Sequence, residues 1–270
     1  ALGKLLITIF GHSGFIGTNL KKYCFNRNIR VFLPKKKQLR FKKNLGNVVY
    51  CIGTGEAKKK PLKAVKANYE ILREILENNS FKSLTYLSTT RVYLHNKKTS
   101  EKDEIINNLN DDSILFSLIK LSAEQLCLNN RNKNIRVIRL TNTYGHHFTK
   151  QLYLLPALIR SAKKSKKINI TINKDSLKNY LHIEEAIPII LDITLKGRER
   201  LYNLAGKKRF RFIDIAKKIQ KKLNCKIILS NQNIVLNDPM IDISKVRKEF
   251  KFNPKRDLIK DLDNIIDNLS

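Results

Sequence analysis

The stretch Leu5-Leu-Ile-Thr-Ile-Phe10-Gly11-His-Ser-Gly14-Phe-Ile-Gly17 decides the fold of this chain. A short β-rich apolar run leads into a glycine-rich turn, and the turn opens an apolar-periodic segment over Phe15–Phe25. The spacing G-x-x-G-x-x-G between a strand and a helix is typical of a dinucleotide-binding turn, because glycines allow a tight turn, close approach of a pyrophosphate and close helix–strand packing. The helix N-terminus would offer N–H groups to the phosphates. A glycine-rich turn without a ligand is the alternative. The predicted cofactor contacts here are Gly11, Ser13, Gly14, Phe15, Ile16 and Gly17.

The rest of the chain alternates strands and helices over its first half. Runs of β-branched residues separated by helices of this length predict a parallel sheet with helices on both faces. After Gly145 the pattern changes to longer helices with small strands between them, which indicates a second, smaller lobe. The predicted strands are Leu5–Phe10, Ile29–Leu33, Val48–Ile52, Leu84–Leu87 and Val137–Leu140. The predicted helices are Phe15–Phe25, Leu62–Asn78, Leu115–Leu128, Leu152–Lys163, Glu184–Leu195 and Ile213–Leu223. The short lysine-rich stretch from Pro34 to Asn47 predicts an abbreviated βα unit.

The composition is strongly basic, with 54 Lys and Arg against 23 Asp and Glu in 270 residues, a formal net charge of +31. This charge suggests a nucleic-acid or anionic-membrane partner. The lysines, however, are dispersed from Lys4 to Lys260, without the aromatic–basic interleaving of RNA-stacking surfaces or any zinc-finger spacing. We therefore favour a solvated lysine coat over a nucleic-acid footprint.

Other features favour a cytoplasmic protein without a membrane segment. No apolar run reaches the roughly 18–20 residues of a membrane-spanning helix, and the first residues do not have the pattern of a signal peptide. The four cysteines lie far apart and form no C-x-x-C pair, so reduced thiols are expected. Adjacent side chains such as His146 and His147 point apart and have no evident third ligand, so no metal site is predicted.

The end of the second predicted strand, Phe32-Leu-Pro-Lys35-Lys36-Lys37, lacks the carboxylate that normally holds the ribose hydroxyls of NAD. Cations at this place suit the 2′-phosphate of NADP, so Lys35 and Lys36 are predicted cofactor contacts. NADP is preferred as the cofactor, and NAD is the alternative.

Further segments follow in order along the chain. They are Val48-Val-Tyr-Cys51-Ile-Gly53, Ala67-Asn68-Tyr-Glu70, Leu87-Ser-Thr89-Thr-Arg91-Val-Tyr93, Arg139-Leu-Thr-Asn142-Thr-Tyr144-Gly145, Tyr180-Leu-His182-Ile-Glu184, Tyr202-Asn-Leu-Ala-Gly206 and Asp242-Ile-Ser-Lys245. With the glycine turn, they make the chain resemble the extended short-chain dehydrogenase/reductase family of nucleotide-sugar epimerases, dehydratases and reductases. The resemblance implies a Rossmann-type doubly wound parallel sheet with a small C-terminal substrate-binding lobe. Residues 1–145 would form the NAD(P)-binding domain, and residues 146–270 mainly the lobe, with some segments returning to the first domain.

The resemblance also implies roles for single residues. Cys51, Ile52 and Gly53 would pass beneath the cofactor, and Asn68 would brace the active-site helix and strand. Thr89 would supply the catalytic hydroxyl, and Lys120 would contact the nicotinamide ribose. The residues implied to frame the substrate are Tyr93, Asn142 and Tyr144. The implied substrate is a nucleotide-diphosphate sugar, in bacterial surface-polysaccharide assembly, and a homodimer is a further expectation.

The chain departs from the family at the catalytic Tyr-x-x-x-Lys pair. The segment Leu115-Phe116-Ser-Leu-Ile-Lys120 keeps the lysine but has Phe116 at the tyrosine position. Phenylalanine exchanges no proton, and general acid–base catalysis contributes about 10²–10⁴-fold. Three explanations stay open: another group supplies the proton, with Tyr93, Tyr144 and Thr89 as candidates, the protein binds without turnover, or the chemistry needs no phenol here.

The first functional hypothesis is therefore an NAD(P)-dependent enzyme that transfers hydride at a carbon of a nucleotide sugar. The second is a catalytically silent NADP(H)-binding sensor or scaffold, motivated by Phe116. The third is an RNA-binding protein on the same scaffold, motivated by the net charge of +31.

Overall fold

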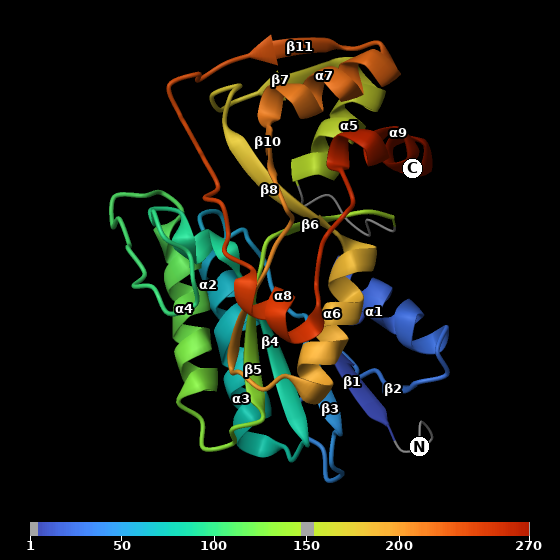
Figure 1. Cartoon of the computed structure of the whole chain (residues 1–270), viewed down its shortest axis with the longest axis vertical. Coiled ribbons are helices and arrows are strands. Elements are labelled where there is room, and N and C mark those ends of the chain that lie inside the picture. Colours follow the sequence, from blue (N-terminus) through green and yellow to red (C-terminus); the bar gives the residue numbers. More distant parts are fainter. Residues whose placement is uncertain (1–4, 147–153, 270) are drawn as a thin grey trace.

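A computed structural model describes residues 5–146 and 154–269 of the chain. In these residues a six-stranded sheet has the order β2-β1-β3-β4-β5-β9, and every neighbouring pair is parallel (Figure 1). Its strands are β1 (Leu6–Phe10), β2 (Arg30–Phe32), β3 (Asn47–Tyr50), β4 (Ser83–Thr89), β5 (Ile135–Leu140) and β9 (Leu201–Leu204). The chain passes from β1 to β2 on one side and returns to β3 on the other. The carboxyl ends of β1 and β3 therefore form a topological switch point, where α/β sheets bind ligands.

Helices cover both faces of this sheet, as the alternation of elements predicts. On one face α1 (Phe15–Phe25) packs against α6 (Ile183–Lys196). On the other, α4 (Ile114–Leu128) packs against the π-helical turn η2 (Lys66–Glu70), which links α2 (Pro61–Val65) to α3 (Ile71–Asn78) (Figure 1). Apart from the edge strand β2, the strands between these layers are almost entirely buried, because apolar side chains project from both faces of a doubly covered sheet.

A second group of elements forms a smaller lobe beyond the carboxyl ends of the strands (Figure 1). It contains a three-stranded sheet, β10-β8-β6, and a two-stranded one, β11-β7. Its strands are β6 (Asn142–Tyr144), β7 (Lys167–Ile170), β8 (Leu177–His182), β10 (Arg209–Arg211) and β11 (Lys226–Leu229). Its helices are α5 (Leu154–Ser165), α7 (Phe212–Leu223) and α9 (Leu258–Asn268). The lobe has an apolar core of its own, to which α5, α7 and α9 contribute.

The predicted Rossmann-type α/β fold is confirmed, and most predicted elements differ from the observed ones by a few residues. The abbreviated unit is also present, because residues 33–46 connect β2 to β3 without a helix. The helix predicted to begin at Leu152 is described only from Leu154 onward. In the second half of the chain, β9 pairs with β5, and α8 (Ser244–Phe250) packs beside β9. The division at residue 145 stays a prediction.

The sequence predicts no membrane-spanning helix and no metal site at His146 and His147. Within the described ranges no helix has the length and apolar character needed to cross a membrane. His146 is described, whereas His147 lies outside the described residues.

Candidate functional site

The glycine turn is held tightly against the neighbouring strand β3. Gly11 has a φ of +81°, and a Cβ atom there would lie 2.8 Å from the backbone nitrogen of Ile52. A Cβ atom at Gly17 would lie 2.3 Å from the carbonyl oxygen of Gly11. Both positions therefore require glycine. Gly14 precedes the first residue of α1, and no acidic side chain stands in the first turn of that helix. The helix N-terminus thus has the geometry and charge that suit a pyrophosphate.

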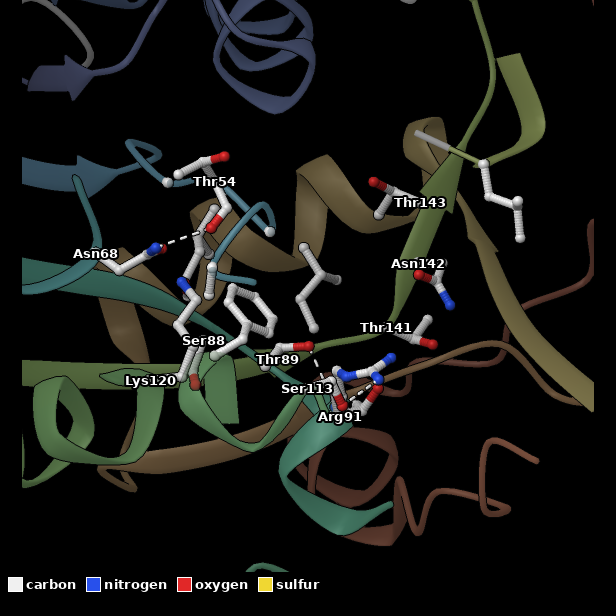
Figure 2. A pocket seen from close by; sticks show the side chains of 18 of the residues that line it. Thr54, Asn68, Ser88, Thr89, Arg91, Ser113, Lys120, Thr141, Asn142 and Thr143 are labelled. Carbon is white, nitrogen blue, oxygen red and sulfur yellow. Dashed lines mark hydrogen bonds between the residues drawn. The ribbon is translucent and has the colours of Figure 1, made fainter. Parts of the chain in front are cut away.

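A cavity of about 610 Å³ lies beyond the carboxyl ends of β3, β4 and β5, between the main sheet and the lobe (Figure 2). Its floor comes from the parallel sheet and one wall from α4, with β6, β8 and α5 opposite. Predicted residues from separate motifs meet in this cavity: Ile16, Cys51, Ile52, Gly53, Thr89, Phe116, Lys120 and Asn142. Residues from the motifs predicted for the cofactor and for the substrate therefore line one cavity, although of the contacts predicted in the glycine turn and the start of α1 only Ile16 reaches it.

Lys120 and Asn68 are two buried polar residues that lie on one side of this cavity (Figure 2). The Lys120 ammonium donates a hydrogen bond of 2.8 Å to the carbonyl oxygen of Leu87. The Asn68 amide nitrogen donates to the carbonyl oxygens of Thr54 and Ala64, both at 2.9 Å, whereas its buried Oδ1 has no partner. A buried acceptor without a donor is costly, so the orphaned Oδ1 fits a site completed by a hydroxyl-bearing ligand. Asn68 lies on the π-helical turn, a feature frequent at functional sites.

Burial lowers the pKa of Lys120 from its ordinary 10.5 to about 8, although Glu124 acts in the opposite direction. The unfolded chain consequently binds more protons than the folded chain between pH 8 and 10.5. Below pH 8 the buried charge of Lys120 therefore lowers the free energy of unfolding by its full amount. This destabilisation disappears as the pH rises toward 10.5.

Replacing Lys120 by methionine should therefore raise the free energy of unfolding at pH 7 by roughly 3 kcal/mol, since each pKa unit of the shift corresponds to about 1.36 kcal/mol. Urea unfolding of both proteins at pH 7, 8.5 and 10 checks this result. The advantage of Lys120→Met should shrink steadily over that series. An equally large advantage at pH 10 would show that the charge is not its cause.

Phe116 lines the cavity one helical turn before Lys120, as expected for the residue at the family's tyrosine position. Its ring also packs against a small apolar cluster formed by Ala57, Ala64 and Ile119. Phe116 and Lys120 therefore lie on the same face of α4, and both line the cavity.

The structure does not bring Tyr93 to the cavity, contrary to the sequence-based expectation. Tyr93 is fully buried, and its hydroxyl lies 2.6 Å from Arg139 Nη1 and 3.1 Å from Asn203 Oδ1. The cause is local: Tyr93 ends the 3₁₀ turn Thr90–Tyr93, and its ring packs into the main apolar core. Burial raises the pKa of Tyr93, although Arg139 opposes it. Tyr93 is therefore neither a substrate contact nor a source of the missing proton.

Tyr144 is also turned away from the cavity. It is 1% exposed, its hydroxyl donates to Asp261 at 2.8 Å, and its ring meets His182 edge-on at 4.9 Å. His182 in turn accepts a hydrogen bond from the Glu184 amide and thereby caps the start of α6. Tyr144 thus joins β6 to α9 within the lobe and is not a second candidate proton donor.

A buried ion pair supports the floor of the cavity. Arg139 binds both oxygens of Glu124, with Nη2 and Oε2 2.7 Å apart, and Ser88 donates to the same carboxylate. Glu124 is fully buried and Arg139 is 4% exposed. Glu124 follows Lys120 by four residues, so the sequence already places both on one face of the helix. The sequence does not indicate that Arg139 is the partner of Glu124.

Removing one member of this pair leaves a buried charge alone. Glu124→Ala should lower the free energy of unfolding by about 3–5 kcal/mol, measured by urea denaturation. Glu77→Ala, which breaks a salt bridge to Arg73 between side chains about half exposed, is the control and should cost less than about 1 kcal/mol. Equal losses in the two variants would contradict the assigned role of burial.

Lys35 and Lys36 lie exposed in the segment after β2, at the sheet edge that also carries the glycine turn. They do not line the cavity itself. Ser13 is exposed in the turn, whereas the Phe15 side chain is buried in the main core, so only its backbone can face a phosphate.

Sequence reasoning missed several polar cavity residues that come from connecting segments. Arg91 and Ser113 lie together near Thr89, with Arg91 Nη2 donating to Ser113 Oγ at 2.5 Å (Figure 2). On the lobe side, Asp238 lies 3.2 Å from Lys178 Nζ. No spacing rule joins residues 91 and 113, because the intervening chain makes an irregular excursion.

Comparison with known protein families identifies the family of this chain. The sequence profile of the NAD dependent epimerase/dehydratase family matches residues 41–205, more than half of the chain. The chain belongs to this family. Among curated proteins, nothing matches it.

Solved structures with the same fold include members of known activity. UDP-glucuronic acid 4-epimerase from Bacillus cereus, in complex with UDP-glucuronic acid and NAD, is 17% identical with a TM-score of 0.83, over 98% of this chain and 99% of that one. RMD from Pseudomonas aeruginosa, complexed with NADPH, is 16% identical with a TM-score of 0.78, over 98% and 99%. dTDP-glucose 4,6-dehydratase from Bacillus anthracis, in complex with NAD, is 16% identical with a TM-score of 0.75, over 98% and 96%. At these identities the likeness shows the fold of this epimerase/dehydratase family member.

Proposed function

We propose that this protein is an NAD(P)-dependent enzyme that oxidises or reduces a carbon of a nucleotide-diphosphate sugar. The observation that carries the proposal is the single cavity in which Lys120, the orphaned Asn68 Oδ1 and the substrate-side Asn142 meet. The family and the dinucleotides and UDP-sugar bound in the similar structures support it. Surface-polysaccharide biosynthesis in the cytoplasm, by a homodimer, is the proposed setting.

Each part of the site would have its own role in binding or catalysis. The glycine turn and the N-terminus of α1 would hold the pyrophosphate, and Lys120 would hold the nicotinamide ribose. Thr89 would contact the reacting hydroxyl, and Asn142 would contact the sugar nucleotide. The bound nicotinamide supplies the hydride acceptor or donor.

We propose NADP as the preferred cofactor, because Lys35 and Lys36 are exposed where the second strand ends and no carboxylate lies in that segment. A 2′-phosphate would gain from these charges, whereas a carboxylate for the ribose hydroxyls of NAD is lacking there.

Calorimetric titration with NADPH and NADH tests the cofactor assignment. NADPH should bind more tightly, and Lys35→Ala/Lys36→Ala should remove that preference while leaving NADH binding unchanged. Mass spectrometry of ligands that copurify is an independent check. If the protein bound neither NADPH nor NADH, the proposed function would be refuted.

Turnover is tested with a panel of UDP- and dTDP-sugars, by following reduced dinucleotide at 340 nm for oxidation and chromatography for epimerisation. The alternative function, a silent NADP(H)-binding sensor or scaffold, is favoured only by Phe116. Binding without turnover across the panel would select that alternative, and turnover by the native chain would exclude it.

A further inference from the structure

The cavity holds few groups that can replace the phenol absent at Phe116. Tyr93 and Tyr144 are excluded by their burial and hydrogen bonds. Thr89 Oγ1 lies in the cavity, but it accepts a bond from the Arg91 amide and has no described carboxylate partner. Asp238 forms a salt bridge of 3.2 Å with Lys178 Nζ, and a proton placed on its carboxylate would break that ion pair.

Two cavity serines are hydrogen-bonded to carboxylates, and their surroundings differ. Ser88 donates to Glu124, which is fully buried and bound on both oxygens by Arg139. A proton placed on Glu124 would break that ion pair and has no route to solvent. Ser113 donates to Asp111 Oδ1 at 2.6 Å, in a partly exposed position.

The Ser113 hydroxyl is oriented by its neighbours. Arg91 Nη2 donates to Ser113 Oγ at 2.5 Å, and the Ser113 hydrogen points to Asp111. A hydroxyl oxygen accepts two hydrogen bonds, so one position on Oγ is left to accept a proton from a ligand. Figure 2 shows Ser113, Arg91 and Thr89 grouped on one side of the cavity.

Asp111 has a connection to solvent on its other side. Its Oδ2 lies 3.0 Å from Nε2 of His95, whose side chain is 32% exposed. Burial acts to raise the pKa of Asp111, but the bonds from Ser113 and His95 and the charge of Arg91 outweigh it and keep that pKa below its usual range. Asp111 is thus a carboxylate at neutral pH and accepts a proton only in transit.

We propose that Ser113, backed by Asp111, is the proton-transfer residue of this cavity in place of the family's tyrosine. The inference rests on the proposed function. In the oxidative direction the sugar hydroxyl gives its proton to Ser113 Oγ, and Ser113 gives its own hydrogen to Asp111 Oδ1. The sugar carbon loses a hydride to the nicotinamide, so the carbon is oxidised by two electrons and the nicotinamide is reduced. The proton on Asp111 leaves to solvent beside His95.

The test compares Ser113→Ala, Asp111→Asn and the conservative Ser113→Thr with the native chain. Binding of NADPH and UDP-glucose by calorimetry should be unchanged in all three. With the best sugar of the panel, kcat should fall about 100-fold in Ser113→Ala and Asp111→Asn at unchanged KM, and Ser113→Thr should keep most activity. Ser122→Ala, an exposed serine on the same helix, is the matched control.

A bypass variant separates proton transfer from a structural role. Adding Phe116→Tyr to Asp111→Asn should restore turnover, because a phenol one helical turn from Lys120 replaces the relay. Unchanged kcat in Ser113→Ala and Asp111→Asn would overturn the relay and leave the proposed function intact. Binding without turnover by the native chain would also overturn it, and absence of dinucleotide binding would overturn both.

Discussion

Phe116→Tyr is expected to raise kcat about 100-fold. The side chain lines the cavity one helical turn from Lys120, whose ammonium lies buried against the Leu87 carbonyl. A phenol placed there would stand beside a cation that stabilises its phenolate form. General acid–base catalysis contributes about 10²–10⁴-fold, and we expect the lower end because the proposed relay already transfers the proton.

The measurement is steady-state turnover with the sugar panel, for native and variant proteins at equal dinucleotide saturation. Phe25→Tyr, which adds the same hydroxyl to an exposed ring on α1, serves as the control and should change nothing. If Phe116→Tyr leaves kcat at the native value, the missing phenol does not limit this chain.

Gly17→Ala is expected to weaken dinucleotide binding by about 100-fold or more. The added Cβ would stand 2.3 Å from the Gly11 carbonyl oxygen, so α1 must move away from the turn. That movement withdraws helix N–H groups from the pyrophosphate, and losing two charge-assisted hydrogen bonds of about 1.5 kcal/mol each corresponds to this factor.

The affinity is measured by calorimetry at a temperature where circular dichroism shows the variant folded. Ser122→Ala, at an exposed position of α4 outside the cavity, is the control and should bind the dinucleotide as the native chain does. Native affinity in Gly17→Ala would mean that the turn does not hold the phosphates.

The fold was predictable because its determinants are local. A strand, a glycine turn and an amphipathic helix occupy Leu6–Phe25 without interruption, and their hydrophobic periods differ visibly. The same holds for Lys120 and Phe116, whose four-residue spacing places them on one helix face.

The other site residues depended on tertiary structure. The sequence alone determined the α/β alternation and predicted the dinucleotide turn and the phenylalanine at the position of the family's tyrosine. Only the folded chain decided that Tyr93 and Tyr144 are buried, that Arg91 and Ser113 meet at the cavity, and that Asp111 is hydrogen-bonded to Ser113. The physical reason is that these side chains follow short turns and irregular connections, which carry no periodic signal for the direction in which a side chain points.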